Sequence, residues 1–265
     1  MKTDIIKKSK KPLVSIIICT LKDNNQIDCI PNLKKQSYKN FEVIVRKDKG
    51  LAKARNEGIK QSKGEVIAFI DDDAIPKKDW VEKILNNLKN EMGITGMCIH
   101  PKKDIFKEFN IPYYQGDKPR YTKLCCGCNM AFRKNIFNEI GLFDPYFDWG
   151  GEETEFSIRF LKKYKLKYCP DVVVTHLNAR NLKHYLKKQY LCGKNDLYFW
   201  RKAGYSLIFQ LFLMSPLPSK NRINIVKSVS STQKLSTVIK KTIIFILGKI
   251  AEDCGIFVSL IKKKK

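Results

Sequence analysis

Short apolar runs alternate with helical patterns along the first third of the chain. The runs are Leu13–Thr20, Phe41–Arg46 and Glu65–Ile70, each rich in β-branched residues and short enough for a strand. Helical patterns follow them at residues 27–35, 51–62 and 80–89. Strands that alternate with helices form parallel sheets, and continuous apolar strands need cover on both faces. The sequence therefore predicts an α/β fold with a mainly parallel sheet flanked by helices.

Three adjacent aspartates, Asp71 to Asp73, directly follow the third predicted strand. In sheets of this kind, ligands bind beyond the carboxyl ends of the strands. Adjacent carboxylates raise one another's pKa unless a cation neutralises them, so the triplet indicates either a cation site or a solvated turn. His176 comes at the end of a later predicted strand, Lys167–Leu177. Carboxylate oxygens with one imidazole suit Mn²⁺ or Mg²⁺, which bind diphosphates. Taken alone, His176 would be interpreted as a core residue.

The strong basic charge points to partners that carry phosphate. Lys and Arg number 51 against 26 Asp and Glu, a net charge of +25. Nucleic acid, an anionic membrane surface and a phosphorylated small molecule all fit this charge. The basic residues are dispersed, and neither an aromatic RNA-binding signature nor a recognition-helix motif is apparent. Nucleic acid is therefore not the expected partner.

The chain changes character beyond about residue 200, where apolar helical patterns are separated by Lys and Ser. Residues 205–214 are too short to span a bilayer, and charges interrupt residues 242–261, so neither is predicted to cross. Apolar residues recur at helical spacing over 238–261, and four lysines close the chain, which suits an anionic membrane surface. Helices packed on the catalytic domain remain the alternative. We predict a basic tail (1–11), an α/β domain (12–200) and a membrane-associating helical segment (201–265).

The nine cysteines predict reduced thiols and a cytoplasmic setting. Together with the membrane-associating segment, this predicts a peripheral position on the inner face of the cell membrane. The number of cysteines is odd and they are scattered, apart from Cys125, Cys126 and Cys128. A structural zinc site would need a second ligand pair at suitable spacing, and we find none, so these three are interpreted as small buried residues. His100 and His184 have no motif around them and are interpreted as surface or core residues. No signal peptide is apparent at the start of the sequence.

Five motifs in a fixed order resemble those of the family 2 glycosyltransferases, which are inverting enzymes with a GT-A fold. In this chain they are PLVSIIICT (12–20), GLAKARNEGI (50–59), FIDDDAIP (69–76), GCNMAFRKNIFNEIGLFD followed by GGEETEFSIR (127–144 and 150–159), and VVVTHL (172–177). The resemblance covers roughly residues 12–200. It implies a sugar transferred from a nucleotide sugar to a hydroxyl of a glycan or lipid-linked acceptor. A non-catalytic GT-A-like protein, or a basic protein associated with nucleic acid, is the alternative.

The resemblance also assigns roles to individual residues. It implies that Asp71, Asp73 and His176 hold a divalent metal, Mn²⁺ or Mg²⁺, on the diphosphate of the donor. Glu153 would be the general base that deprotonates the acceptor hydroxyl. Glu152 and Trp149 would contact the acceptor. The residues implied to bind the nucleotide sugar are Thr20, Asp48, Lys53, Arg55, Asn56 and Asp72.

Two departures from the family pattern affect the site. The loop after the second strand, Arg46–Gly50, is short and leaves only Asp48 as an acidic candidate for holding the base and ribose. The nucleotide is therefore left open. The second departure is Glu153 itself, which stands where Asp is commoner, so its carboxylate reaches farther by about one methylene, and position governs the efficiency of a base.

Overall fold

A computed structural model describes residues 3–7, 11–102, 104–106, 114–177, 179–202 and 235–261. The chain divides into two compact units, Met1–Asn178 and Ala179–Lys265. The domain boundary predicted from the sequence, between residues 200 and 201, stays a prediction, and it differs from the division into compact units. The difference arises because the helix over 182–202 packs with the C-terminal helix, a tertiary contact that composition does not reveal.

The first unit is built on one sheet with the strand order β1-β3-β2-β4-β8-β6-β9-β5, and β7 pairs with β9. The strands are β1 (Thr3–Lys7), β2 (Val14–Cys19), β3 (Phe41–Arg46), β4 (Val66–Ile70), β5 (Ile75–Pro76), β6 (Gly93–Ile99), β7 (Arg120–Thr122), β8 (Asn129–Arg133) and β9 (Leu166–Thr175). The helices are α1 (Ile30–Lys34), α2 (Leu51–Gln61), α3 (Trp80–Asn87), α4 (Ile136–Glu139) and α5 (Glu152–Leu161), with a 3-10 turn at Asn24–Gln26.

The centre of the sheet is parallel, as predicted, and antiparallel strands are added around it. Strand β2 pairs in parallel with both β3 and β4, and β6 pairs in parallel with β9. Strand β8 runs antiparallel to β4 and to β6, so β4, β6 and β9 all point the same way. The sequence did not predict β6. It also placed β1, which pairs with β3, inside the basic tail.

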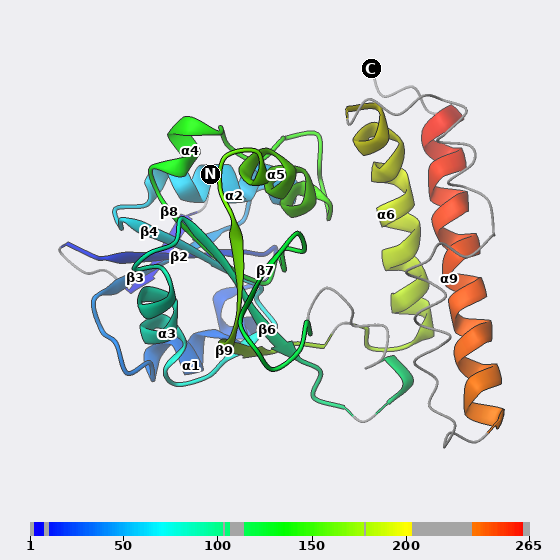
Figure 1. The fold of residues 1–265 in the computed structure, drawn as a ribbon, viewed down its shortest axis with the longest axis horizontal. Coiled ribbons are helices and arrows are strands. Elements are labelled where there is room, and N and C mark those ends of the chain that lie inside the picture. Colours follow the sequence, from blue (N-terminus) through cyan, green and yellow to red (C-terminus); the bar gives the residue numbers. More distant parts are fainter. Residues whose placement is uncertain are drawn as a thin grey trace. The chain divides into compact units, whose positions relative to one another are not determined.

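Helices cover both faces of the sheet, with α2, α4 and α5 on one face and α1 and α3 on the other (Figure 1). Successive side chains of β2 pack on opposite faces of the sheet, because side chains along a strand alternate in direction. Ile16 and Ile18 join the core cluster that contains Trp80 of α3. Ile17 faces α2, where a Cβ on Gly58 would lie 2.6 Å from its side chain, so that close packing requires glycine.

Strand direction brings distant parts of the chain to one edge of the sheet. Strand β4 ends at Ile70, and its antiparallel partner β8 begins opposite, at Asn129. Strand β9 ends at Thr175, paired with Ile99 at the end of β6. The same carboxyl edge of the sheet therefore carries three segments: the aspartate triplet after β4, the turn before β8, and His176 after β9.

The second unit pairs helix α6 (Leu182–Lys202) with helix α9 (Leu235–Ile261). Glycine permits their close approach, since a Cβ on Gly193 of α6 would overlap the backbone of Glu252. Gly255 of α9 has the same relation to the carbonyl of Tyr190. Within the described part of the chain, no helix combines the length and apolarity that crossing a membrane needs. The apolar run at 205–214 lies outside the described residues.

Candidate active site

The outer two aspartates of the triplet meet His176 at the carboxyl edge. Nε2 of His176 lies 3.2 Å from Oδ1 of Asp73 and 3.8 Å from Oδ2 of Asp71. The triplet forms a turn in which Ala74 N–H donates to the carbonyl of Asp71, at 3.1 Å. The backbone N–H of His176 donates to the carbonyl of Ile99, at 3.0 Å, which fixes the start of the segment after β9. Two carboxylates and one buried imidazole form a donor set that fits Mn²⁺ or Mg²⁺.

The middle aspartate, Asp72, is held by different partners. It accepts a hydrogen bond from the hydroxyl of Thr20, which follows β2. The ammonium of Lys22 lies 3.0 Å from its other oxygen. The structure therefore brings together two residues predicted to bind the nucleotide sugar, and adds Lys22, which sequence reasoning missed. A lysine three residues past β2 carries no distinctive signal in so basic a chain.

Arg55 is a buried charged residue on α2 that contacts several residues of the site. Its guanidinium donates to Glu152 Oε1 at 2.6 Å and to the carbonyl of Gly127 at 2.9 Å. It also lies over the rings of Phe69 and Phe143. Burial by itself would lower the pKa of Arg55, but the surrounding acidic groups, Glu152 first, raise it above its ordinary value. Arg55 was predicted to lie near the nucleotide. That role stays a prediction.

Glu152 and Glu153 begin helix α5 and differ sharply in environment. Glu152 is 1% exposed and bound to Arg55, and its Oε2 has no hydrogen-bond partner among the described residues. Burial, followed by the neighbouring Glu153, raises the pKa of Glu152, and Arg55 opposes the rise. Glu153 is partly exposed, and its Oε2 accepts a hydrogen bond from Gly151 N–H at 3.2 Å. Of the two, Glu153 has the accessible carboxylate that a general base requires.

The turn before β8 places Gly127 between Arg55 and Glu153. A Cβ at this position would lie 3.1 Å from a guanidinium nitrogen of Arg55 and 3.5 Å from Cδ of Glu153. A side chain at this position would press on the guanidinium of Arg55, which would have to move by a few tenths of an ångström. The carboxylate of Asp71 also raises the pKa of Arg55. Arg55 therefore interacts both with the aspartates near His176 and with Glu152 at the start of α5. The site is thus one connected arrangement across four segments of the chain.

The remaining predicted residues have varied surroundings. Asp48 is bound by Arg46, with its carboxylate 2.7 Å from two guanidinium nitrogens. The amide of Asn56 both donates to and accepts from the backbone of Phe143, which gives it a structural role. Lys53 is exposed. Trp149 is 36% exposed, next to Asp148, whose carbonyl accepts from the first N–H of α2.

The sequence model of Glycosyl transferase family 2 matches residues 23–141. Glycosyltransferase AglE of Haloferax volcanii is 26% identical over 212 residues, which are 72% of this chain and 67% of that protein. Polypeptide N-acetylgalactosaminyltransferase 13 of Homo sapiens is 27% identical over 192 residues, but the match covers only 34% of its length and 58% of this chain.

Among solved structures, the mannosyltransferase PcManGT from Pyrobaculum calidifontis, in complex with GDP-Man and Mn²⁺, has a TM-score of 0.64 at 14% identity. The likeness covers 97% of this chain and 89% of that one. The match over residues 23–141 agrees with the predicted resemblance to family 2, and the likeness to PcManGT confirms the predicted GT-A fold. They do not test the roles of individual residues, which stay predictions.

Proposed function

Because residues 23–141 match the sequence model of glycosyltransferase family 2, we propose that this chain transfers one sugar from a nucleotide-sugar donor to a hydroxyl of a glycan or lipid-linked acceptor. The transfer inverts the anomeric configuration and is assisted by a divalent metal. The observation that carries this proposal is the meeting of Asp71, Asp73 and His176 at the carboxyl edge, next to the acidic start of α5. The Mn²⁺ and GDP-Man of the archaeal fold neighbour lend it support.

The outer aspartates and His176 would hold the divalent metal. A bound Mn²⁺ or Mg²⁺ neutralises the charge that develops on the leaving nucleoside diphosphate. Asp72 is tied to Thr20 and Lys22, so it orients the turn rather than competing for the metal. The ammonium of Lys22, one third exposed, is available to the donor phosphates.

Glu153 takes the proton from the acceptor hydroxyl. The hydroxyl oxygen attacks the anomeric carbon in line, the bond from that carbon to the diphosphate oxygen breaks, and the electron pair leaves with the diphosphate. One displacement inverts the configuration, and no covalent enzyme intermediate forms. Behind Glu153, the guanidinium of Arg55 is bound to Glu152.

The second unit suits attachment to an anionic membrane surface. One side of α9 exposes an apolar stripe in which each side chain is 50% to 67% exposed, comprising Ile243, Ile246, Ile250, Phe257 and Ile261. The charges of α9 lie elsewhere, because Lys249 is only 7% exposed and pairs with Glu252 and Asp253. Exposed apolar side chains on one side of a helix whose Lys249 is buried favour an apolar surrounding for that side.

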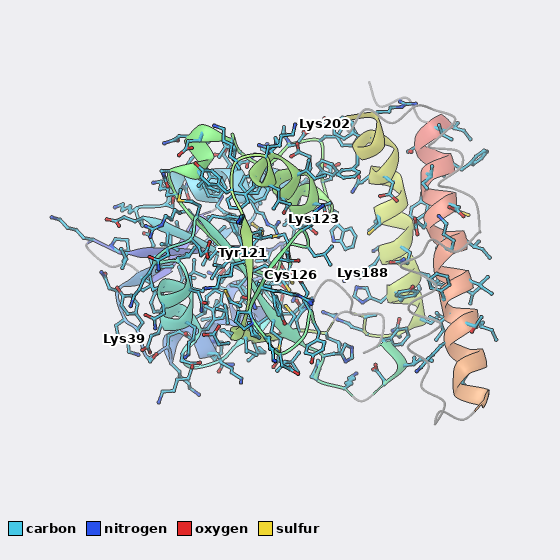
Figure 2. All side chains as sticks on the ribbon, in the orientation of Figure 1. Lys39, Tyr121, Lys123, Cys126, Lys188 and Lys202 are labelled. Atoms are coloured by element: carbon cyan, nitrogen blue, oxygen red, sulfur yellow. The ribbon has the colours of Figure 1, made fainter. Side chains whose placement is uncertain are left out.

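Helix α6 supplies the positive charge that such a surface attracts. Its basic residues are Lys183, Lys187, Lys188, Lys194, Arg201 and Lys202, against a single acid, Asp196. Figure 2 labels Lys188 and Lys202 on this helix. Lysines near an anionic leaflet each contribute about 1 kcal/mol. We therefore place the enzyme peripherally on the inner, cytoplasmic face of the cell membrane, where a lipid-linked acceptor is within reach.

A panel of nucleotide sugars tests the proposed reaction and identifies the donor. Purified protein is incubated with each donor and Mn²⁺ or Mg²⁺, and release of nucleoside diphosphate is followed with and without EDTA. We expect metal-dependent release from one or a few donors. Turnover that EDTA leaves undiminished would exclude the metal assignment, and no release from any donor, with or without glycan and polyprenyl-phosphate acceptors, would count against catalysis.

A further inference from the structure

Three buried cysteines from two segments meet at the carboxyl edge of the sheet. Cys98 lies on β6, and Cys126 and Cys128 lie in the turn before β8. The Sγ atoms are 3.2 Å apart for Cys98 and Cys126, 3.4 Å for Cys98 and Cys128, and 3.4 Å for Cys126 and Cys128. Each side chain is at most 2% exposed, and Cys126 is labelled inside the sheet unit in Figure 2. Cys98 thus adds a third thiol to the two of the turn, from a position that no local spacing indicates.

The three sulfur atoms form a nearly equilateral triangle, which suits a single thiophilic ion. Zinc–sulfur bonds are about 2.3 Å long, so tetrahedral coordination places the sulfur atoms about 3.8 Å apart, and the triangle needs to widen by only roughly half an ångström. A disulfide would instead bring two sulfur atoms to about 2.05 Å and leave the third thiol aside. Three almost equal separations favour no particular pair.

We infer that Cys98, Cys126 and Cys128 form a binding site for a thiophilic metal ion of the Zn²⁺ class, distinct from the carboxylate site. Burial raises the pKa of all three thiols well above the ordinary value, so the metal-free cluster is neutral and loading releases protons. The two sites adjoin, since the ligand atoms of Cys128, Asp71 and His176 lie within 4.8 Å of one another.

The ion would fasten the turn before β8 to strand β6. At present Cys126 N–H donates to the hydroxyl of Thr95 on β6, at 2.9 Å, and the thiols add no covalent link. Between the two cysteines lies Gly127, whose carbonyl accepts from Arg55. Metal–thiolate bonds on both sides of Gly127 would fix that carbonyl, and with it the guanidinium that neutralises Glu152.

Cobalt provides the probe, because thiolate ligands give Co²⁺ an intense near-ultraviolet charge-transfer band that oxygen and nitrogen ligands do not. Full-length protein, freed of metals and kept reduced, is titrated with Co²⁺ in excess Mg²⁺, and Zn²⁺ is then added to displace the Co²⁺. We expect one equivalent of Co²⁺ to produce the band and Zn²⁺ to bleach it. Cys98→Ala is expected to weaken Zn²⁺ binding by more than about 100-fold, since even losing an outer-shell partner costs about 10- to 100-fold.

Cys169→Ala is the matched control, because Cys169 is a buried cysteine of the same core cluster that belongs to no candidate metal group. It is expected to keep the band and the Zn²⁺ affinity. A reduced wild-type protein without the band would overturn the inference, and this holds even if Cys98→Ala fails to fold. A band that survives in Cys98→Ala and disappears in Asp71→Asn would assign the sulfur to Cys128 at the carboxylate site. A disulfide that includes Cys98, found by counting the free thiols of the native protein, would also overturn the inference. None of these measurements depends on sugar transfer.

Discussion

Replacing Glu153 by Gln separates a catalytic base from a helix-capping acid. The substitution keeps the shape and an oxygen that can accept from Gly151 N–H at 3.2 Å, but removes basicity. Acids in the first turn of a helix contribute about 0.3–1 kcal/mol through the helix dipole, so stability is expected to change by less than that. Loss of a general base costs about 10²- to 10⁴-fold in rate, which corresponds to about 2.7–5.4 kcal/mol of transition-state stabilisation.

The assay measures turnover and donor affinity together, with the melting temperature as a check on folding. We expect Glu153→Gln to lose turnover by that factor while it still binds the donor. Glu155→Gln is the control on the same helix. Glu155 is bound by Arg159 through two nitrogens, so this variant is expected to lose stability but keep turnover below its melting temperature. If Glu153→Gln turns over normally and Glu152→Gln does not, the base is assigned one residue too late. If all three remain active, the acidic helix is structural.

The other predictions concern the metal, the buried pair and the membrane. His176→Ala is expected to weaken Mn²⁺ binding in calorimetry without unfolding the domain, and a sharp fall in melting temperature with unchanged affinity would make His176 a core residue. Arg55→Met leaves Glu152 buried without its partner and is expected to cost about 3–5 kcal/mol of unfolding free energy. Arg55 opposes the rise in the pKa of Glu152, so its loss raises that pKa further. The cost should therefore grow as pH rises through the wild-type value of about 8, because the folded wild type then releases a proton that the folded variant retains; a cost independent of pH would contradict this. Ile250→Lys is expected to reduce sedimentation with anionic vesicles, whereas Thr242→Lys, an added charge off the stripe, is not; equal binding of both would place the attachment elsewhere.

The sequence predicted the elements with strong local signals. The strands at 13–20, 41–46 and 65–70 and the helices that follow are confirmed to within a few residues, because continuous β-branched runs and helical periodicity are local properties. Strand β6 was missed. Its sequence, GITGMCI, carries two glycines and no alternation of apolar and polar residues, and only its pairing with β8 and β9 makes it a strand.

The site likewise contains contacts that the order of motifs predicts and contacts that only the folded chain reveals. The meeting of Asp71, Asp73 and His176 follows from strand direction once the order of motifs is known. The pairing of Arg55 with Glu152 does not, since 97 residues separate them and each alone reads as a surface charge. Cys98 likewise joins Cys126 and Cys128 only through the pairing of β6 with β8, which no spacing in the sequence indicates.

The stereochemistry and metal dependence of the first product test the central claim most directly. With the donor identified by the panel, proton NMR of the initial product reports the configuration of its anomeric carbon. We predict an inverted anomer from the wild type with Mn²⁺, and no product in EDTA or from Asp73→Ala. An initial product that retains the donor's configuration, or one formed equally well by Asp73→Ala, would contradict the account.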